Sequence, residues 1–229
     1  MRCGKIGFAV VLVLAAALGA PGGASIAGDS KAGDSKAGDS KDGGSKDGDS
    51  GDAESAGDED AAWRALQQPG HAALMRHAHA PGVADDPDME IDDCATQRAL
   101  DAQGREQARA IGARLRAHGV DDRLVYTSRM CRAIDTAKLL AVGTVVGLPV
   151  LDSYFGDDEQ RETIVAGLRT FLRTDPLTPP PILVTHTPNI NEMSGVQPEQ
   201  GGMVIVRVTA SGALETVGRI APPPEPDEE

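Results

Sequence analysis

The chain has 229 residues, a formal net charge of −13 and few aromatic side chains. Arg2 and Lys5 give residues 1–27 a charge of +2, residues 28–60 contain eleven acidic residues and four lysines (−7), and residues 222–229 contain four acidic residues (−4), which leaves −4 for residues 61–221. Neutralising a nucleic-acid backbone requires a cationic face, so nucleic acid is excluded as an expected partner. Residues 61–221 have the length of one ordinary domain.

Residues 1–27 have the pattern of a cleaved secretory signal. Arg2 and Lys5 provide a positively charged start, and residues 6–20 are almost wholly apolar. The tripeptide Ser25-Ile26-Ala27 ends in small residues at the usual cleavage spacing. The apolar run is short for a membrane-spanning helix. We therefore expect an exported protein, periplasmic or extracellular, with no stable membrane span after cleavage.

Residues 28–60 form an acidic linker built on a repeat that begins as Gly28-Asp-Ser-Lys-Ala32. The repeat contains only small and charged side chains, which cannot bury a core, so we expect it to be disordered. Calcium-binding repeats have a longer period with an apolar position, and this repeat lacks both. The Pro-rich acidic tail at residues 222–229 is also expected to be disordered.

Residues 61–221 alternate predicted helices and strands. Apolar runs and period-two patterns predict strands at residues 71–75, 124–127, 145–151, 181–185, 203–208 and 214–220. Helical periodicity predicts helices at residues 61–67, 101–118, 128–140 and 159–173, and another from Thr187. Asp101, Ser128 and Thr187 are the expected N-caps, and Pro149 weakens the third strand. The alternation predicts an α/β fold, a three-layer αβα sandwich with a mostly parallel sheet whose last two strands form an antiparallel edge.

Basic and titratable side chains follow three of the predicted strands. Arg76 and His77 end the first strand. Arg132 lies in the first turn of the helix after the second strand, and His186 ends the strand at residues 181–185. The carboxyl ends of parallel strands meet at one edge of a sheet, where helix N-termini add unpaired N–H groups. These side chains are therefore predicted to surround one tetrahedral anion, most simply a phosphate.

Three segments in this order and spacing resemble the histidine phosphatase superfamily. They are Leu74-Met-Arg-His-Ala78, Thr127-Ser-Arg-Met-Cys-Arg-Ala-Ile-Asp-Thr-Ala137 and Val184-Thr-His-Thr187. The helix segment Gly104-Arg-Glu-Gln-Ala108 matches a fourth family segment. The resemblance covers roughly residues 70–210, and it implies a histidine phosphatase-like catalytic domain over residues 61–221.

The resemblance assigns roles to individual residues. It makes His77 the nucleophile that becomes phosphorylated, and it places Arg76, Arg132 and His186 on the phosphoryl oxygens, with His186 also counted as catalytic. Phosphoryl transfer depends mainly on positioning and on cations around the equatorial oxygens. A neutral imidazole can attack phosphorus without a metal. The implied activity is a metal-independent phosphomonoesterase with a phosphohistidine intermediate and no cofactor.

Two positions depart from the family pattern. Ala78 stands where the family usually has glycine, and its methyl group is unstrained only if φ is negative. The family's general acid usually follows the third strand, where this chain has Ser153. Asp152, Asp157 and Asp158 are the candidates for that acid, in this order. A phosphatase without a strong acid favours good leaving groups, and the alternative is a non-catalytic phosphate-ligand binding module that has lost its acid.

Residues 81–98 form a long acidic loop that is expected to line the pocket. Cys94 in this loop and Cys131 beside Arg132 are the cysteines that remain after signal removal. In an exported protein such a pair suggests a disulfide, and the alternative is two free or buried thiols. A bridge would tie the loop to the helix that carries Arg132. Arg98 is expected to pair with a nearby aspartate, with substrate contact as the alternative.

The histidines also permit a metal site to be considered. His77 and His79 alternate at a strand end, as some zinc ligands do. Further ligands would have to come from His71, His118, His186 or the loop aspartates, so we expect no metal. His71 and His118 are expected to be structural or surface groups.

The expected partner is a small phosphorylated substrate outside the cytoplasm. The segments Asp93-Cys-Ala-Thr-Gln-Arg98 and Met130-Cys-Arg132 resemble a bacterial envelope branch of the family, which includes lipopolysaccharide core heptose phosphatases. This looser resemblance suggests an envelope sugar phosphate as substrate. A mutase requires cytosolic phosphoglycerates, so the predicted export argues against one.

Overall fold

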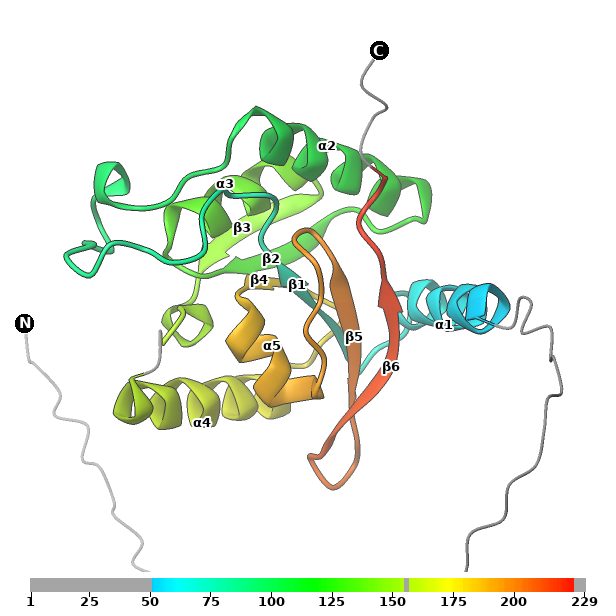
Figure 1. The fold of residues 1–229 in the computed structure, drawn as a ribbon. Helices are drawn as coiled ribbons and strands as arrows, with labels where there is room; N and C mark the ends of the chain where they lie inside the picture. Colours follow the sequence, from blue (N-terminus) through cyan, green and yellow to red (C-terminus); the bar gives the residue numbers. More distant parts are fainter. Residues whose placement is uncertain (1–50, 155–156, 225–229) are drawn as a thin grey trace, which may run out of the picture. The chain divides into compact units, whose positions relative to one another are not determined.

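The computed structural model describes residues 51–154 and 157–224, with side chains from Asp58 onward (Figure 1). The predicted signal at residues 1–27, the repeat before Gly51 and the end of the acidic tail lie outside the described residues. Among the described residues, no helix is both long and apolar enough to cross a bilayer.

A six-stranded sheet forms the centre of the fold, in the order β3-β2-β4-β1-β5-β6 (Figure 1). Its strands are β1 His71–Arg76, β2 Arg123–Thr127, β3 Gly143–Gly147, β4 Ile182–Thr185, β5 Met203–Val208 and β6 Leu214–Ile220. The pairs β1–β4, β2–β4 and β2–β3 are parallel, whereas β5 is antiparallel to both β1 and β6. The sheet is therefore mixed, with β5 running opposite to the other five strands.

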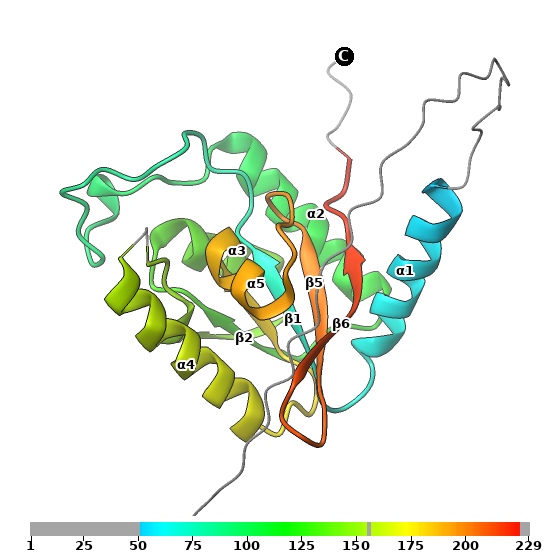
Figure 2. The same ribbon diagram turned by 60° about the horizontal axis from the view of Figure 1, so that its bottom comes forward.

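Helices cover both faces of the sheet and give the predicted three layers (Figure 2). The helices are α1 Gly51–Ala65, α2 Ala102–Ala117, α3 Cys131–Leu140, α4 Asp158–Thr174 and α5 Thr187–Ser194. One core joins α1, α2 and α3 to one face of the sheet, and a second core joins α4 and α5 to the other face. Strand β1 shows the alternation: Ala73 and Met75 enter the first core, while Ala72 and Leu74 enter the second.

The first helix begins earlier than predicted. The acidic composition before residue 61 indicates a linker, but α1 extends back to Gly51 and packs against β6. Gly218 of β6 permits this approach, because a Cβ there would lie 2.4 Å from the carbonyl oxygen of Asp58. Glu59 accepts hydrogen bonds from Trp63 and from Arg114 of α2. Tertiary contacts thus stabilise a helix that composition alone argues against.

Three other boundaries differ from the sequence prediction. Strand β3 ends at Gly147, and Pro149 begins a 3₁₀ helix, Pro149–Leu151, instead of continuing the strand. Helix α3 begins at Cys131, because the Ser128 hydroxyl accepts from the backbone N–H of Met130 and closes a turn before the helix. His186, rather than Thr187, is the N-cap of α5, so the predicted cap is displaced by one residue.

The sheet order places the three predicted site segments side by side. Strand β4 lies between β1 and β2, and all three run in the same direction. Beyond the strand ends, His77 donates its backbone N–H to Thr185 over 3.1 Å, and Ser128 donates its own to Val184 over 2.9 Å. The carboxyl ends of β1, β2 and β4 therefore form one edge, at which the site is built.

Candidate active site

His77 lies one residue beyond β1 and is 3% exposed. Its ring Nδ1 lies 2.8 Å from the carbonyl oxygen of Ala78. A carbonyl oxygen can only accept, so Nδ1 carries the proton and Nε2 carries the lone pair. Burial lowers the pKa of His77 to about 3, against the opposing effect of the Ala78 hydrogen bond. The ring is therefore neutral at neutral pH, which leaves Nε2 available as a nucleophile.

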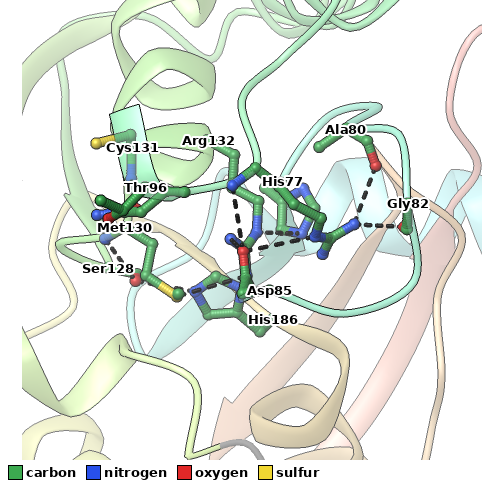
Figure 3. A network of polar contacts seen from close by, with 12 residues as sticks. His77, Ala80, Gly82, Asp85, Thr96, Ser128, Met130, Cys131, Arg132 and His186 are labelled. Carbon is green, nitrogen blue, oxygen red and sulfur yellow. Dashed lines mark hydrogen bonds and ion pairs between the residues drawn. The ribbon is translucent and has the colours of Figure 1, made fainter. Parts of the chain in front are cut away.

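Arg132 lies beside this lone pair. It comes from the first turn of α3 and is 1% exposed. Its Nε donates to His77 Nε2 over 3.1 Å, and its Nη1 and Nη2 donate to the two carboxylate oxygens of Asp85 over 2.8 and 2.9 Å. Burial lowers the pKa of Arg132, and the Asp85 carboxylate opposes that shift. One guanidinium thus contacts the nucleophile with one nitrogen and a carboxylate with the other two (Figure 3).

His186 completes the group from the end of β4. Its ring centroid lies 5.4 Å from that of His77. Its Nε2 lies 2.9 Å from the Ser128 Oγ, and its Nδ1 lies 3.5 Å from Nη2 of Arg132. Arginine only donates, so Nδ1 accepts and Nε2–H donates to the serine. Burial lowers the pKa of His186 well below its ordinary value. His77, Arg132 and His186, which the sequence predicted separately, therefore lie together (Figure 3).

The backbone after His77 is held by α3. The backbone N–H of Ala78 donates to the Thr136 hydroxyl over 3.0 Å, and that hydroxyl donates to the carbonyl oxygen of Arg132 over 2.7 Å. Ala78 is fully buried and does not have a positive φ, so its methyl group is accommodated without backbone strain. Sequence reasoning did not single out Thr136. Its position one helical turn after Arg132 was the available signal.

Helix α2 braces the next residue. His79 donates its backbone N–H to the Gln107 side chain over 2.9 Å, and its ring Nδ1 lies 3.1 Å from the Asp101 carboxylate. A Cβ on Gly104 would lie 1.9 Å from the His79 carbonyl oxygen. Only glycine allows the helix to approach the backbone this closely, which accounts for the Gly104 segment in the predicted family match.

Asp152, the first predicted acid, supports His186 through Ser128. The Ser128 hydroxyl lies 3.1 Å from Asp152 Oδ1, and Arg129 donates to the same carboxylate through its backbone N–H over 2.7 Å and its Nε over 2.8 Å. A carboxylate with these donors is suited to orient His186 rather than to release a proton. The other two predicted acids are exposed: Asp157 caps α4, and Asp158 lies in the first turn of that helix.

Arg76 lies at the entrance of the group. Its Nη1 donates to the carbonyl oxygen of Pro198 over 3.1 Å, and its buried Nε has no hydrogen-bond partner among the described residues. Burial, followed by the charge of Arg98, lowers the pKa of Arg76. Arg76 also lines a cavity of about 580 Å³ together with His79, Gln107, Glu199 and Gln200. One donor of Arg76 is therefore available next to a space that can hold a small molecule.

The acidic loop after His77 closes over these groups. Asp85, on this loop, has a side chain that is 3% exposed and contacts Arg132 as described above. The Nε of Arg98 lies 3.5 Å from Asp85 Oδ1, and its Nη1 donates to the carbonyl oxygens of Ala80 and Gly82. Arg98 thus pairs with a nearby aspartate, as predicted. Nothing in the loop pattern separated Asp85 from its neighbouring acids, so sequence reasoning missed it.

A disulfide joins Cys94 of the acidic loop to Cys131, with the two Cα atoms 5.7 Å apart and a sequence separation of 37. It anchors the loop beside Arg132, as the sequence predicted. Cys94→Ser is expected to destabilise the fold by about 3 kcal/mol and to lower Tm by about 10 °C, because the unfolded chain loses a constraint. Activity should also fall, since the loop loses an anchor.

Differential scanning calorimetry with and without reductant checks this prediction. Reduction should lower the Tm of the wild type and leave that of Cys94→Ser unchanged. If both reduction and Cys94→Ser leave Tm and activity as they were, the bridge does not support the site.

The lowered pKa of His77 makes stability depend on pH. The unfolded chain protonates this histidine below its ordinary pKa of 6.5, whereas the folded protein keeps it neutral down to about 3. The contribution of His77 to the free energy of unfolding is therefore greatest above pH 6.5 and is lost as the pH falls toward 3. Between pH 7 and 4.5 the loss from His77 is expected to be about 2 kcal/mol, and His186 acts in the same direction.

Urea unfolding of the wild type and of His77→Gln at pH 7 and 4.5 measures this effect. The variant should lose less stability on acidification than the wild type. The matched control, His79→Gln, should lose as much as the wild type. Equal acid sensitivity of all three proteins would show that His77 titrates normally.

The other histidines do not form a metal site. No group of three or more His, Cys, Asp or Glu side chains suited to a metal ion occurs within residues 51–154 and 157–224. His71 lies against the carbonyl oxygens of Gln68 and Pro69, and His118 stacks on Trp63 with centroids 3.9 Å apart. Their positions agree with the structural roles expected for them.

The chain is similar to known proteins in sequence and in fold. Residues 73–161 match the family described as histidine phosphatase superfamily (branch 1). The solved structure of the protein histidine phosphatase SixA, complexed with tungstate, has 18% identity and a TM-score of 0.50, and covers 66% of this chain and 97% of its own. Mycobacterial glucosyl-3-phosphoglycerate phosphatase has 16% identity and a TM-score of 0.47, with 64% and 96% of the two chains covered.

None of the curated protein sequences matches the chain. The family match spans the segments that carry Arg76, His77 and Arg132, and the likeness to SixA extends over nearly that whole structure. The motifs, the site that they build and the shared fold agree with one another. Residues 73–161 of the chain are similar in sequence to the histidine phosphatase superfamily (branch 1), and the fold of the chain is similar to that of a solved histidine phosphatase.

Proposed function

We propose that this protein is a metal-independent phosphomonoesterase that acts through a phosphohistidine intermediate on His77. The observation that carries the proposal is the orientation of the His77 ring. Its Nδ1 proton is held by the Ala78 carbonyl oxygen, and its Nε2 lone pair faces the Arg132 guanidinium. An orienting partner on one nitrogen and a cation at the other is the arrangement that a histidine nucleophile requires for attack on phosphorus.

The surrounding residues supply electrostatic stabilisation. Arg132 is a fixed cation that donates to the nucleophile, and the charge of Arg76 also acts on His77. His186 is oriented through Ser128 and Asp152, and its Nδ1 lies 3.5 Å from Nη2 of Arg132, so it helps to hold that guanidinium in place. Charge on the transferred phosphoryl group spreads over three equatorial oxygens, so preorganised donors around it lower the barrier without a covalent role of their own.

The proposed substrate is a small phosphate ester outside the cytoplasm, with an envelope sugar phosphate as the preferred class. The signal-like segment at residues 1–27 and the Cys94–Cys131 disulfide both support an oxidising, extracytoplasmic location. The cavity beside Arg76 is lined by Gln107, Glu199 and Gln200, whose side chains can hydrogen-bond sugar hydroxyl groups.

A phosphate-ester panel tests the proposal. The purified protein is assayed with aryl phosphates and with hexose and heptose phosphates, in the presence of a chelator, and inorganic phosphate is measured. Chelator-resistant release of phosphate is expected, with the highest kcat/KM for a sugar phosphate. Activity that chelation abolishes and zinc restores would contradict the metal-independent mechanism.

The alternative, a non-catalytic phosphate-ligand binding module, predicts a different result. Such a module would bind inorganic phosphate in calorimetry but release none from any ester of the panel. It would also form no acid-labile phosphoprotein. The neutral, oriented imidazole of His77 favours the enzyme, because a binding module gains nothing from a nucleophilic lone pair held in a fixed direction.

A further inference from the structure

The acidic loop brings a carboxylate to the position expected for a phosphate. The Asp85 carboxylate accepts hydrogen bonds from both terminal nitrogens of Arg132 in a bidentate pair. Arg98 lies against the same carboxylate. Bidentate pairing to arginine is equally the geometry by which arginine binds phosphate. Asp85 and Arg132 have side chains that are 3% and 2% exposed. A substrate that binds Arg132 through these nitrogens must therefore displace the Asp85 carboxylate.

Displacement leaves Asp85 close to the reacting group. The loop is anchored on one side of Asp85 by the chain that leaves His77, and on the other by Arg98 and the disulfide at Cys94. The Arg98 backbone N–H also donates to Asp85, over 3.3 Å. With these anchors the carboxylate can move away from Arg132 without leaving the site.

The position of Asp85 relative to His77 suits the departing oxygen. His77 contacts the Nε of Arg132, whereas Asp85 contacts Nη1 and Nη2, so the two groups approach different nitrogens of one guanidinium (Figure 3). Displacement at phosphorus is in line, and the leaving oxygen departs on the side away from the nucleophile. Of the acids considered above, Asp152 is engaged with Ser128 and Arg129, and Asp157 and Asp158 are exposed on α4.

We propose that Asp85 is the general acid of this phosphatase. Its carboxylate is displaced from Arg132 by the phosphoryl group of the substrate, and it then protonates the leaving oxygen. This inference rests on the proposed phosphatase function. An ester phosphate placed against the carboxylate puts two anions side by side, an arrangement that retains a proton between them. The proton enters with the monoanionic ester or from solvent.

Bonds and protons balance in both halves of the proposed reaction. The His77 lone pair forms the N–P bond while the ester P–O bond breaks, and the proton of the Asp85 carboxyl passes to the leaving oxygen. In the second half, the Asp85 carboxylate accepts a proton from a water molecule as that water attacks phosphorus. The N–P bond then breaks, its electron pair returns to His77, and inorganic phosphate is released.

The dependence of rate on leaving group tests the proposal. The wild type, Asp85→Asn and the matched control Asp86→Asn are assayed with 2,4-dinitrophenyl phosphate, whose leaving group needs no proton, and with phenyl phosphate, whose leaving group does. Asp86 is the exposed neighbour of Asp85 and accepts a hydrogen bond only from within its own turn, at Asp88. Binding of inorganic phosphate is measured by calorimetry for all three proteins.

For Asp85→Asn we expect kcat/KM on phenyl phosphate to fall by about 100-fold or more, with little change on 2,4-dinitrophenyl phosphate. Inorganic phosphate should bind the same variant about 10-fold more tightly, because no carboxylate competes for Arg132. Asp86→Asn should match the wild type in every measurement.

Four results would overturn the assignment. Equal losses on both esters would make Asp85 a structural residue, and no loss on either would exclude it from catalysis. A variant that has lost its fold would reveal itself by a lowered Tm and by weaker phosphate binding, and Asp85→Glu, which keeps the carboxyl group, would then have to restore phenyl phosphate turnover. A wild type that hydrolyses neither ester would refute the phosphatase function itself, and with it the role of Asp85.

Discussion

Replacing His77 with alanine is expected to lower kcat/KM for any phosphate ester by at least about 10⁴-fold and to abolish covalent labelling by substrate. The reason is geometric. The Nε2 lone pair is the group that the Ala78 carbonyl oxygen and Arg132 orient together, and none of the neighbouring side chains replaces it. The loss should be similar for good and poor leaving groups, because the same nucleophile displaces both.

Steady-state kinetics and rapid quenching in alkali measure the two parts of this prediction. The wild type should yield a phosphoprotein that is labile to acid and stable to base, as phosphohistidine is. The control is His118→Ala, which removes an exposed imidazole that stacks on Trp63 and leaves the His77 contacts in place. This control should keep both labelling and turnover. Labelling that persists in His77→Ala would place the covalent intermediate on another residue.

Much of the site could be predicted because its residues follow strands. Arg76, His77 and His186 end apolar runs that can only be buried strands, and parallel strands bring such ends together. The order of the strands was not needed for this conclusion. The same reasoning predicted the position of Arg132. It lies in the first turn of α3, and three residues separate the end of β2 from the start of that helix.

The part that we propose for Asp85 could not be predicted in this way. The loop at residues 81–98 contains five aspartates in a segment without periodicity, and only the folded chain shows that Asp85 is buried against Arg132. The position expected from the family pattern led instead to Asp152, which contacts Ser128 and Arg129. A side chain whose partner lies 47 residues away leaves no local signal in the sequence.

Helix α1 shows that composition alone is also an insufficient basis for predicting an element. The acidic run before residue 61 indicates disorder, because an isolated segment of this kind buries little apolar surface. In the fold, Glu59 meets Arg114, and Trp63 packs between that arginine and the ring of His118. The charges that predict a linker become partners of α2 once the helix lies against the sheet.

The second large effect concerns Arg132. Arg132→Met is expected to lower kcat/KM by roughly 10³-fold, because the phosphoryl oxygens lose their most buried cation. It should also destabilise the fold by about 3 kcal/mol, since the Asp85 carboxylate is left buried without its bidentate partner. The expected cost lies at the lower end of the range for broken buried pairs, because Arg98 remains beside Asp85.

The double variant Asp85→Ala/Arg132→Met separates these two consequences. Removing both members of the pair removes the buried charge, so stability measured by urea unfolding should recover most of the loss, while kcat/KM stays low. Arg129→Met is the matched control: its side chain is 48% exposed, and loss of its ion pair with Asp152 should cost less than about 1 kcal/mol. If the double variant is no more stable than Arg132→Met, the buried pair does not couple the loop to α3, and the loss of stability must arise from the packing of Arg132 itself.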